Sequence, residues 1–170
     1  MPEQTDGGIP PCEIRIDKEG TWFFRGAEMF RKEIIRLFCD NLRRDETGRY
    51  LIELNGERCR LEVDDTPFAV RSVSAAPAPV EAGEYLILLN DGSEEVLDTE
   101  TLWIGEGNVM YCLVRSREFP ARFTRAAYYQ LAAHIEYDEA AGVPYLRRGN
   151  SRFSIPGAGA AGNANMPPGS

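Results

Sequence analysis

The pair Asn55–Gly56 leaves few choices for the fold of the segment around it. The runs at 50–54 and 57–63 on either side are rich in strand-forming residues. An Asn-Gly pair between two such runs favours a two-residue hairpin turn, because both turn residues then need a positive φ. Cys59, Leu61 and Val63 alternate with charged residues, which is typical of a strand with one buried face. The sequence therefore predicts an antiparallel hairpin here.

Further strands and two helices are predicted on both sides of this hairpin. By the same signals, strand pairs are expected at 12–16 with 21–24, at 85–90 with 94–98, and at 101–104 with 109–116. Apolar residues recur at helical spacing over residues 27–44 and again over residues 119–139, where Pro120 suits a first helical turn. The predicted fold class is α+β.

These elements divide into two small sheet-plus-helix units. Residues 14–76 are predicted to form the first unit and residues 84–138 the second, with a linker at 77–83 that is rich in Pro, Ala and Gly. Residues 1–13 are expected to be a flexible N-terminus. Residues 139–170 are expected to be a mostly disordered tail, because Gly, Ala, Asn and Pro dominate their end.

The charge distribution limits the partners that the chain can bind. The net charge is −8 at pH 7, whereas general nucleic-acid binding needs a basic surface, so none is expected. Arg71 is the only basic residue between Glu62 and Tyr111, a stretch that carries many acids. This acidic middle region is either a solvated sheet face or a docking surface for a protein partner.

The cysteines and the N-terminus indicate the cellular compartment of the protein. No apolar run is long enough to span a membrane, and the N-terminus lacks the basic and apolar parts of a signal peptide. The four cysteines have no short C-x-x-C spacing and His134 is the single histidine, so no metal site or cofactor is predicted. We predict a cytoplasmic protein with reduced thiols, no membrane association, and His134 at least half-buried on the second helix.

Two adjacent aspartates follow the run at 57–63. Neighbouring strand residues point to opposite faces, so Asp64 and Asp65 can chelate a cation together only if the chain turns there. Pro67 pushes the preceding Thr66 toward extended geometry. Three interpretations stay open: an aspartate that fixes the turn, a contact with a ligand or partner, and a metal site.

No catalytic motif is present in the sequence. It contains no G-x-S-x-G nucleophile elbow, no Walker A loop and no H-E-x-x-H. We therefore predict no catalytic residue and favour a protein without enzymatic activity. A metal-assisted hydrolase that uses Asp64 or Asp65 is the minor alternative.

One face of the second predicted helix suits an anion. Arg122, Arg125 and Tyr129 fall within a narrow arc at helical spacing, and two guanidiniums with a phenol can hold a group such as phosphate. The same face equally suits pairing with the acidic middle region or simple solvation.

Three segments resemble a bacterial family called domain of unknown function 1285. They are GTWFFRGAEMFRKEIIRLFCDNLRRDETGRY at 20–50, ERCRLEVDDTPFAV at 57–70, and YCLVRSREFPARFTRAAYYQL at 111–131. The resemblance extends over about residues 14–137. The chain departs from the family in its long C-terminal extension and in the segment TLWIGEGN at 101–108.

The resemblance implies two small α+β units that arose by duplication, the second of them pleckstrin-homology-like. It also implies a nucleotide-like or other anionic small ligand bound between the units, and a role in bacterial signalling with no established enzymatic activity. The candidate ligand-binding residues that it indicates are Trp22, Arg25, Arg43, Arg44, Asp45, Asp64, Pro67, Phe68, Arg115, Arg122 and Tyr129. We expect a non-catalytic ligand-binding or sensing protein, with a protein-interaction adaptor as the alternative.

Overall fold

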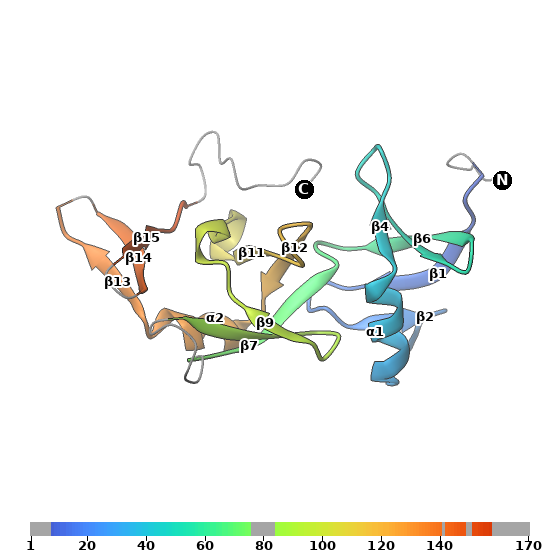
Figure 1. Ribbon diagram of the computed structural model, residues 1–170, viewed down its shortest axis with the longest axis horizontal. Coiled ribbons are helices and arrows are strands. Elements are labelled where there is room, and N and C mark those ends of the chain that lie inside the picture. The colour runs from blue at the N-terminus through green and yellow to red at the C-terminus, as the bar shows by residue number, and fades with distance from the viewer. Residues whose placement is uncertain (1–7, 76–83, 141, 149–150, 158–170) are drawn as a thin grey trace. The chain divides into compact units, whose positions relative to one another are not determined.

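The computed structural model describes residues 8–75, 84–140, 142–148 and 151–157. Contacts within the chain divide it into two compact units, of which the first ends at Pro67 and the second begins at Phe68. Each unit has its own six-stranded sheet, and the second also carries a three-stranded sheet (Figure 1).

The sheet of the first unit has the strand order β3-β2-β1-β6-β5-β4. Strands β1 and β6 run parallel and every other neighbouring pair is antiparallel. Trp22, Ile16 and Leu42 are buried in its core with Ile35 and Cys39 of the helix. The elements are β1 Pro11–Ile16, β2 Trp22–Phe24, β3 Ala27–Glu28, α1 Lys32–Asp40, β4 Leu42–Arg44, β5 Tyr50–Leu54 and β6 Glu57–Val63.

The main sheet of the second unit has the order β10-β11-β12-β7-β8-β9, with β7 and β12 parallel. Phe68, Val70, Leu102 and Leu131 are buried in its core. The elements are β7 Phe68–Ala75, β8 Tyr85–Leu89, β9 Glu94–Val96, η1 Thr99–Thr101, β10 Trp103–Ile104, η2 Glu106–Asn108, β11 Met110–Val114, β12 Phe119–Phe123 and α2 Arg125–Ala132. The three-stranded sheet consists of β13 Ile135–Asp138, β14 Val143–Arg148 and β15 Ser151–Ser154.

Both six-stranded sheets have the same topology. In each unit the first three strands are consecutive neighbours, the last three are consecutive neighbours, and the first and sixth strands pair in parallel at the centre. The helix differs in position, since α1 follows the third strand of its unit whereas α2 follows the sixth. The α+β class and the two similar units are confirmed, and this shared strand order supports a duplication. The pleckstrin-homology-like character of the second unit stays a prediction.

The hairpins predicted from turn residues are confirmed. Asn55 and Gly56 have φ values of 54° and 80°, and Leu54 pairs with Glu57 directly across the turn. The pairs β1–β2, β8–β9 and β10–β11 also form where the sequence predicts them. Local turn chemistry therefore decided these pairings.

The first helix is shorter than the predicted 27–44. Ala27–Glu28 pairs with β2, and Leu42–Arg44 pairs with β5, so only Lys32–Asp40 is helical. Backbone hydrogen bonding to neighbouring strands replaces the helical bonds at both ends, and the periodicity of the sequence contains no information about those strands. Two of the apolar residues that recur at helical spacing are not buried, because Phe30 and Leu37 are 76% and 46% exposed.

The second helix does not begin near Pro120. Phe119–Phe123 forms β12, which lies between β11 and β7 and pairs with both. Helix α2 begins after Thr124, whose side-chain oxygen accepts a hydrogen bond from the Ala127 N–H at 3.2 Å. Ala127 and Leu131 are fully buried, so the helix is held by both its cap and its packing.

Replacing Thr124 with alanine is expected to lower the free energy of unfolding by about 1 kcal/mol, because the Ala127 N–H loses its acceptor. Thr124→Ser keeps the oxygen and is expected to lose less than about 0.5 kcal/mol. Urea unfolding of the three proteins measures the difference. Equal losses for both variants would show that packing of the Thr124 methyl group, and not the cap, is what matters.

The unit boundaries differ from those predicted. Strand β7 pairs with β8 and β12, so residues 68–75 belong to the second unit and not to the first. Strand β1 begins at Pro11, inside the predicted flexible N-terminus, and β14 and β15 lie in the predicted disordered tail. The tail folds there because its Tyr145, Leu146 and Ile155 are buried. The predicted linker at 77–83, residues 1–7 and residues 158–170 lie outside the described residues.

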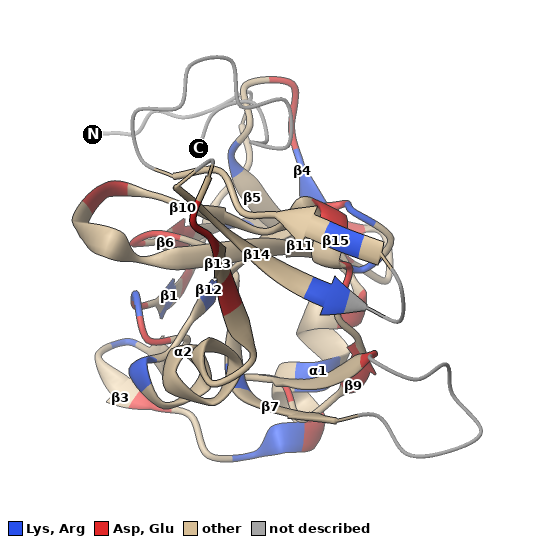
Figure 2. Cartoon of the chain, turned by 90° about the vertical axis from the view of Figure 1, so that its left-hand side faces the viewer, with Lys and Arg blue, Asp and Glu red and all other residues tan. Residues whose placement is uncertain are grey.

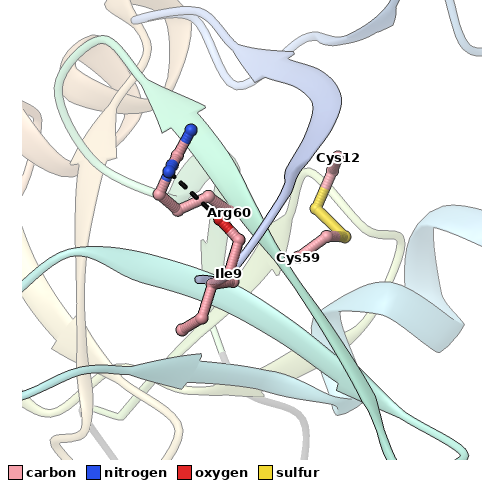
Figure 3. Close-up of a disulfide and its surroundings, with 4 residues drawn as sticks. All are labelled: Ile9, Cys12, Cys59 and Arg60. Atoms are coloured by element: carbon pink, nitrogen blue, oxygen red, sulfur yellow. Dashed lines mark hydrogen bonds between the residues drawn. A yellow bond between two sulfur atoms is a disulfide. The ribbon is translucent and has the colours of Figure 1, made fainter. Parts of the chain in front are cut away.

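The prediction of reduced cysteines is wrong for one pair. Cys12 and Cys59 form a disulfide with their Cα atoms 4.9 Å apart (Figure 3), whereas Cys39 and Cys112 are buried and not disulfide-bonded. The parallel pairing of β1 with β6 brings the two residues together, and cysteine spacing does not reveal such a pairing. His134 is exposed after α2, with its ring 5.2 Å from that of Tyr85, so its predicted burial is also wrong.

Within the described residues no helix is long and apolar enough to cross a membrane.

Candidate functional site

The first unit contains a cavity of about 770 Å³ with mostly apolar walls, which we call the unit-1 cavity. Strands β1, β5 and β6 provide one set of wall residues: Cys12, Ile14, Ile52, Leu54 and Cys59. Strand β2, the segment before α1 and α1 itself provide the other set: Phe24, Met29, Phe30, Ile34 and Phe38. Ligand sites in proteins typically have this size and this apolar character.

Helix α1 has apolar residues on two of its faces. Ile35 and Cys39 are buried in the core of the unit, whereas Ile34 and Phe38 line the cavity one helical turn apart. The Phe38 ring stacks on that of buried Trp22, with 6.2 Å between centroids. The helix therefore supplies both a packed core and an open apolar wall.

Polar groups at the cavity come mainly from the turn between β5 and β6 and from the start of β6. Asn55, Glu57 and Arg58 line it there, and Arg31 lines it from the segment before α1. The Arg31 guanidinium lies 3.1 Å from the Glu33 carboxylate, so part of its charge is already balanced. Such a site suits a ligand with a large apolar body and a small polar part.

The part of the cavity wall that contains the Cys12–Cys59 disulfide lies where the pairing of β1 with β6 is irregular. Strand β1 pairs with β6 at Pro11 opposite Arg60, and the register shifts before pairing resumes at Arg15 opposite Glu62. Glu13, within this interval, has a φ of 65°. Figure 3 shows Arg60 beside the disulfide, where its guanidinium donates to the Ile9 carbonyl at 3.2 Å.

The predicted ligand-binding residues Trp22 and Arg25 do not line this cavity. Trp22 is 1% exposed and belongs to the core. Arg25 donates to the Glu13 carboxylate at 3.0 and 3.1 Å and lies over the Phe24 ring. Arg25 does line a smaller cavity of about 350 Å³, together with Glu13, Arg15 and Glu62. Its charge is therefore matched within the protein.

The three predicted residues after α1 also have internal roles. Arg43 lies 3.7 Å from the Glu53 carboxylate, and Arg44 lies over the Tyr50 ring and donates to its hydroxyl. Asp45 accepts hydrogen bonds from Thr47, and the Thr47 hydroxyl lowers the pKa of this carboxyl. Asp45 thus fixes the turn into β5, as an Asx residue commonly does.

Asp64 pairs with an arginine and not with Asp65. The Arg15 guanidinium donates to both Asp64 oxygens, and this hydrogen bonding lowers the pKa of the carboxyl. No group of three or more His, Cys, Asp or Glu side chains is placed to hold a metal within the described residues. Asp64 therefore has a role that none of the three interpretations named, an ion pair with Arg15 of β1.

In the second unit the structure brings two predicted residues together. The Arg115 guanidinium lies 5.0 Å from the centre of the buried Phe68 ring and donates to Asp91. Arg122, by contrast, lies in β12, whereas Tyr129 lies on α2 and is 60% exposed. The predicted helical face of Arg122, Arg125 and Tyr129 does not exist, because Arg122 precedes the helix. Pro67 is buried at the end of the first unit.

The acidic middle region is partly neutralised by the turn between β11 and β12. Arg117 donates to Asp98 at 2.6 Å and to Glu100 at 3.3 Å. The Glu95 carboxylate accepts the Arg115 backbone N–H, and burial raises its pKa. Figure 2 shows basic and acidic residues in both units. The region is thus less available to a protein partner than its composition suggests.

Sequence reasoning missed the unit-1 cavity. Two signals were present: the apolar spacing of Phe30, Ile34 and Phe38, and a hairpin with Cys59 on its apolar face. Helical periodicity predicts that these side chains avoid water, but it does not predict whether protein or ligand covers them.

Comparison with known proteins gave a family match that covers the first unit. Residues 7–66 match the family described as domain of unknown function (DUF1285), N-terminal domain. A search of curated proteins found no match. The crystal structure of a DUF1285 family protein from Silicibacter pomeroyi DSS-3 is similar, with 25% identity, a TM-score of 0.68, and coverage of 85% of this chain and 80% of that one.

A second crystal structure, of a DUF1285 family protein from Shewanella baltica OS155, has the same fold. It is 18% identical, with a TM-score of 0.59, and the match covers 72% of this chain and 91% of that one. Residues 7–66 thus match the N-terminal domain of the DUF1285 family, and most of the chain is similar in structure to a protein of that family.

Proposed function

We propose that this chain is a non-catalytic small-ligand-binding protein whose ligand occupies the unit-1 cavity. The observation that supports the proposal is a cavity of about 770 Å³ inside one folded unit, with apolar walls from four strands and a helix. Ligand pockets commonly measure about 300 to 1,000 Å³. The proposal places the ligand within the first unit, whereas the family resemblance implies a site between the units.

Exposed aromatic side chains at the cavity provide a driving force for binding. Phe30 is 76% exposed and Phe24 is 42% exposed, and both line the cavity. Large apolar side chains exposed together commonly mark a binding surface. A ligand that covers them removes apolar area from water, which contributes about 25 cal/mol per Å².

The wall chemistry favours a ligand with an apolar body over a nucleotide. A nucleotide presents several phosphate charges, and proteins usually meet them with clustered arginines, lysines or backbone N–H groups. The cavity offers Arg31 and Arg58, and Glu57 lies beside them. A chain alcohol such as decanol is therefore the better probe, and ATP serves as the competing one.

Ile34→Trp is expected to fill the cavity and weaken decanol binding at least about tenfold, because the indole takes the space of the alkyl chain. Leu37→Trp is the matched control, since Leu37 lies on the same helix, is 46% exposed, and does not line the cavity. Titration calorimetry measures both affinities, and a thermal melt checks that both variants fold.

Three results would count against the proposal. Decanol that binds both variants equally would place its site elsewhere, and decanol that does not bind the unmodified protein would remove the proposal. ATP that binds where decanol does not would favour the nucleotide-like ligand.

Fewer observations support the adaptor role, the role in signalling and the cytoplasmic location than support ligand binding. The internal pairing of Asp91, Asp98 and Glu100 with arginines makes an acidic docking surface the weaker candidate. A role in bacterial signalling is supported by the family resemblance alone. The cytoplasmic location stays a prediction, and the Cys12–Cys59 disulfide argues against it, because disulfides persist mainly in oxidising compartments.

A further inference from the structure

We infer that the Cys12–Cys59 disulfide is a redox-controlled clamp on the wall of the unit-1 cavity, and that its reduction loosens the wall and weakens ligand binding. The effect on the ligand rests on the proposed function. The effect on the wall does not, because it concerns the strand pairing alone.

Both sulfur-bearing residues belong to the cavity wall. Cys12 comes from β1 and Cys59 from β6, and both line the cavity. Each is half-buried, so a reductant that enters the cavity can reach the disulfide.

The backbone holds the first half of β1 weakly. Only the pair Pro11–Arg60 precedes the register shift in the β1–β6 ladder. Pro10 and Pro11 have no N–H group to donate. Beside the disulfide, the contacts toward β6 include the hydrogen bond from the Arg60 N–H to the Pro10 carbonyl at 2.8 Å and that from the Arg60 guanidinium to the Ile9 carbonyl at 3.2 Å.

Beyond the shift, β1 is held by more than the disulfide. Arg15 and Ile16 pair with Glu62 and Val63, and the Asp64 N–H donates to the Ile16 carbonyl at 2.9 Å. Ile14 and Ile16 are also buried. Glu13 is also held, because the Arg25 N–H donates to its carbonyl at 2.9 Å and the Arg25 guanidinium donates to its carboxylate. Loosening is therefore confined to residues 11 and 12 and to the part of the wall that Cys12 forms.

The reaction is a thiol–disulfide exchange. A thiolate of a dithiol attacks one sulfur of the disulfide, which breaks the S–S bond and forms a mixed disulfide. The second thiol of the reductant then attacks that mixed disulfide and closes its own ring. Two electrons and two protons pass to the protein, which leaves Cys12 and Cys59 as free thiols.

The test compares the full chain before and after treatment with dithiothreitol, with conversion checked by mass. Amide hydrogen exchange at Arg60 is expected to speed up at least about tenfold on reduction, because its acceptor on Pro10 becomes mobile. The Glu53 amide, which donates to the Asn41 carbonyl at 3.0 Å, serves as the matched control in the same unit and is expected to change much less. Decanol affinity is expected to fall about tenfold.

The double variant C12S/C59S separates this disulfide from any other effect of the reductant. It is expected to behave like the reduced protein and to show no response to dithiothreitol. Unchanged exchange at Arg60 on reduction, or a response of the double variant, would overturn the clamp. If the double variant does not fold, amide exchange at Arg60 in the reduced native protein still tests whether the disulfide holds the wall.

The affinity measurement distinguishes this inference from the proposed function. If decanol binds the oxidised and reduced proteins equally, the proposed function stands, but the inference that the disulfide regulates binding is overturned. Decanol that binds neither form overturns the proposed function, whereas exchange at Arg60 continues to decide the clamp.

Discussion

Replacing Arg115 with alanine is expected to lower the free energy of unfolding of the second unit by about 3 to 5 kcal/mol, because the variant leaves a buried carboxylate without its cation. The Asp91 side chain is fully buried, and the Arg115 guanidinium lies 2.5 Å from its oxygen. Asp91 also accepts hydrogen bonds from Ser93, but these are neutral donors and do not balance its charge. Urea unfolding followed by Trp103 fluorescence measures the loss.

Arg117→Ala is the matched control for this prediction. Arg117 lies in the same turn, has a similarly positive φ of 67° against 53° for Arg115, and pairs with Asp98. Because the Arg117 side chain is 51% exposed, its loss is expected to destabilise the second unit much less than the loss of Arg115 does. Backbone strain on substitution is shared by both variants, so the difference between them reports burial of the ion pair. Similar losses for the two variants would contradict the expectation.

The parts of the fold that the sequence predicted are those with local causes. The turn at Asn55–Gly56 and the hairpins around it follow from residues close together in the chain. The ends of both helices did not follow. Strands β3 and β4 pair with the adjacent strands β2 and β5, and β12 pairs with β7, which is far away along the chain. Helical periodicity gives no sign of these pairings, and strand pairing can override local propensity.

The candidate site was predicted poorly for a related reason. Sequence reasoning chose arginines as ligand-binding groups, but Arg25, Arg43 and Arg115 pair with acids inside their own units. Those acids lie between 10 and 24 positions away along the chain, so spacing does not identify them. The cavity depends on tertiary contacts among β1, β5, β6 and α1, and no single motif contains it.

Removing the Cys12–Cys59 disulfide is expected to lower the free energy of unfolding of the first unit by about 2 to 4 kcal/mol, because the cross-link restricts the unfolded chain. The two cysteines are 47 positions apart, and longer loops give larger effects in the chain-entropy account. Urea unfolding of C12S/C59S, followed by Trp22 fluorescence in a Trp103→Phe background, measures the loss. The unmodified protein in dithiothreitol is the control, and its unfolding curve should coincide with that of the variant.

Stability and ligand affinity together distinguish a clamp from a simple cross-link. A disulfide that acts only on the unfolded chain lowers stability when it is removed, yet it leaves the affinity of the folded protein unchanged. A disulfide that also holds residues 11 and 12 against β6 changes both quantities when it is removed, since the folded state itself then loses part of its cavity wall. Loss of stability with unchanged decanol affinity and unchanged exchange at Arg60 would therefore assign Cys12–Cys59 a purely structural role.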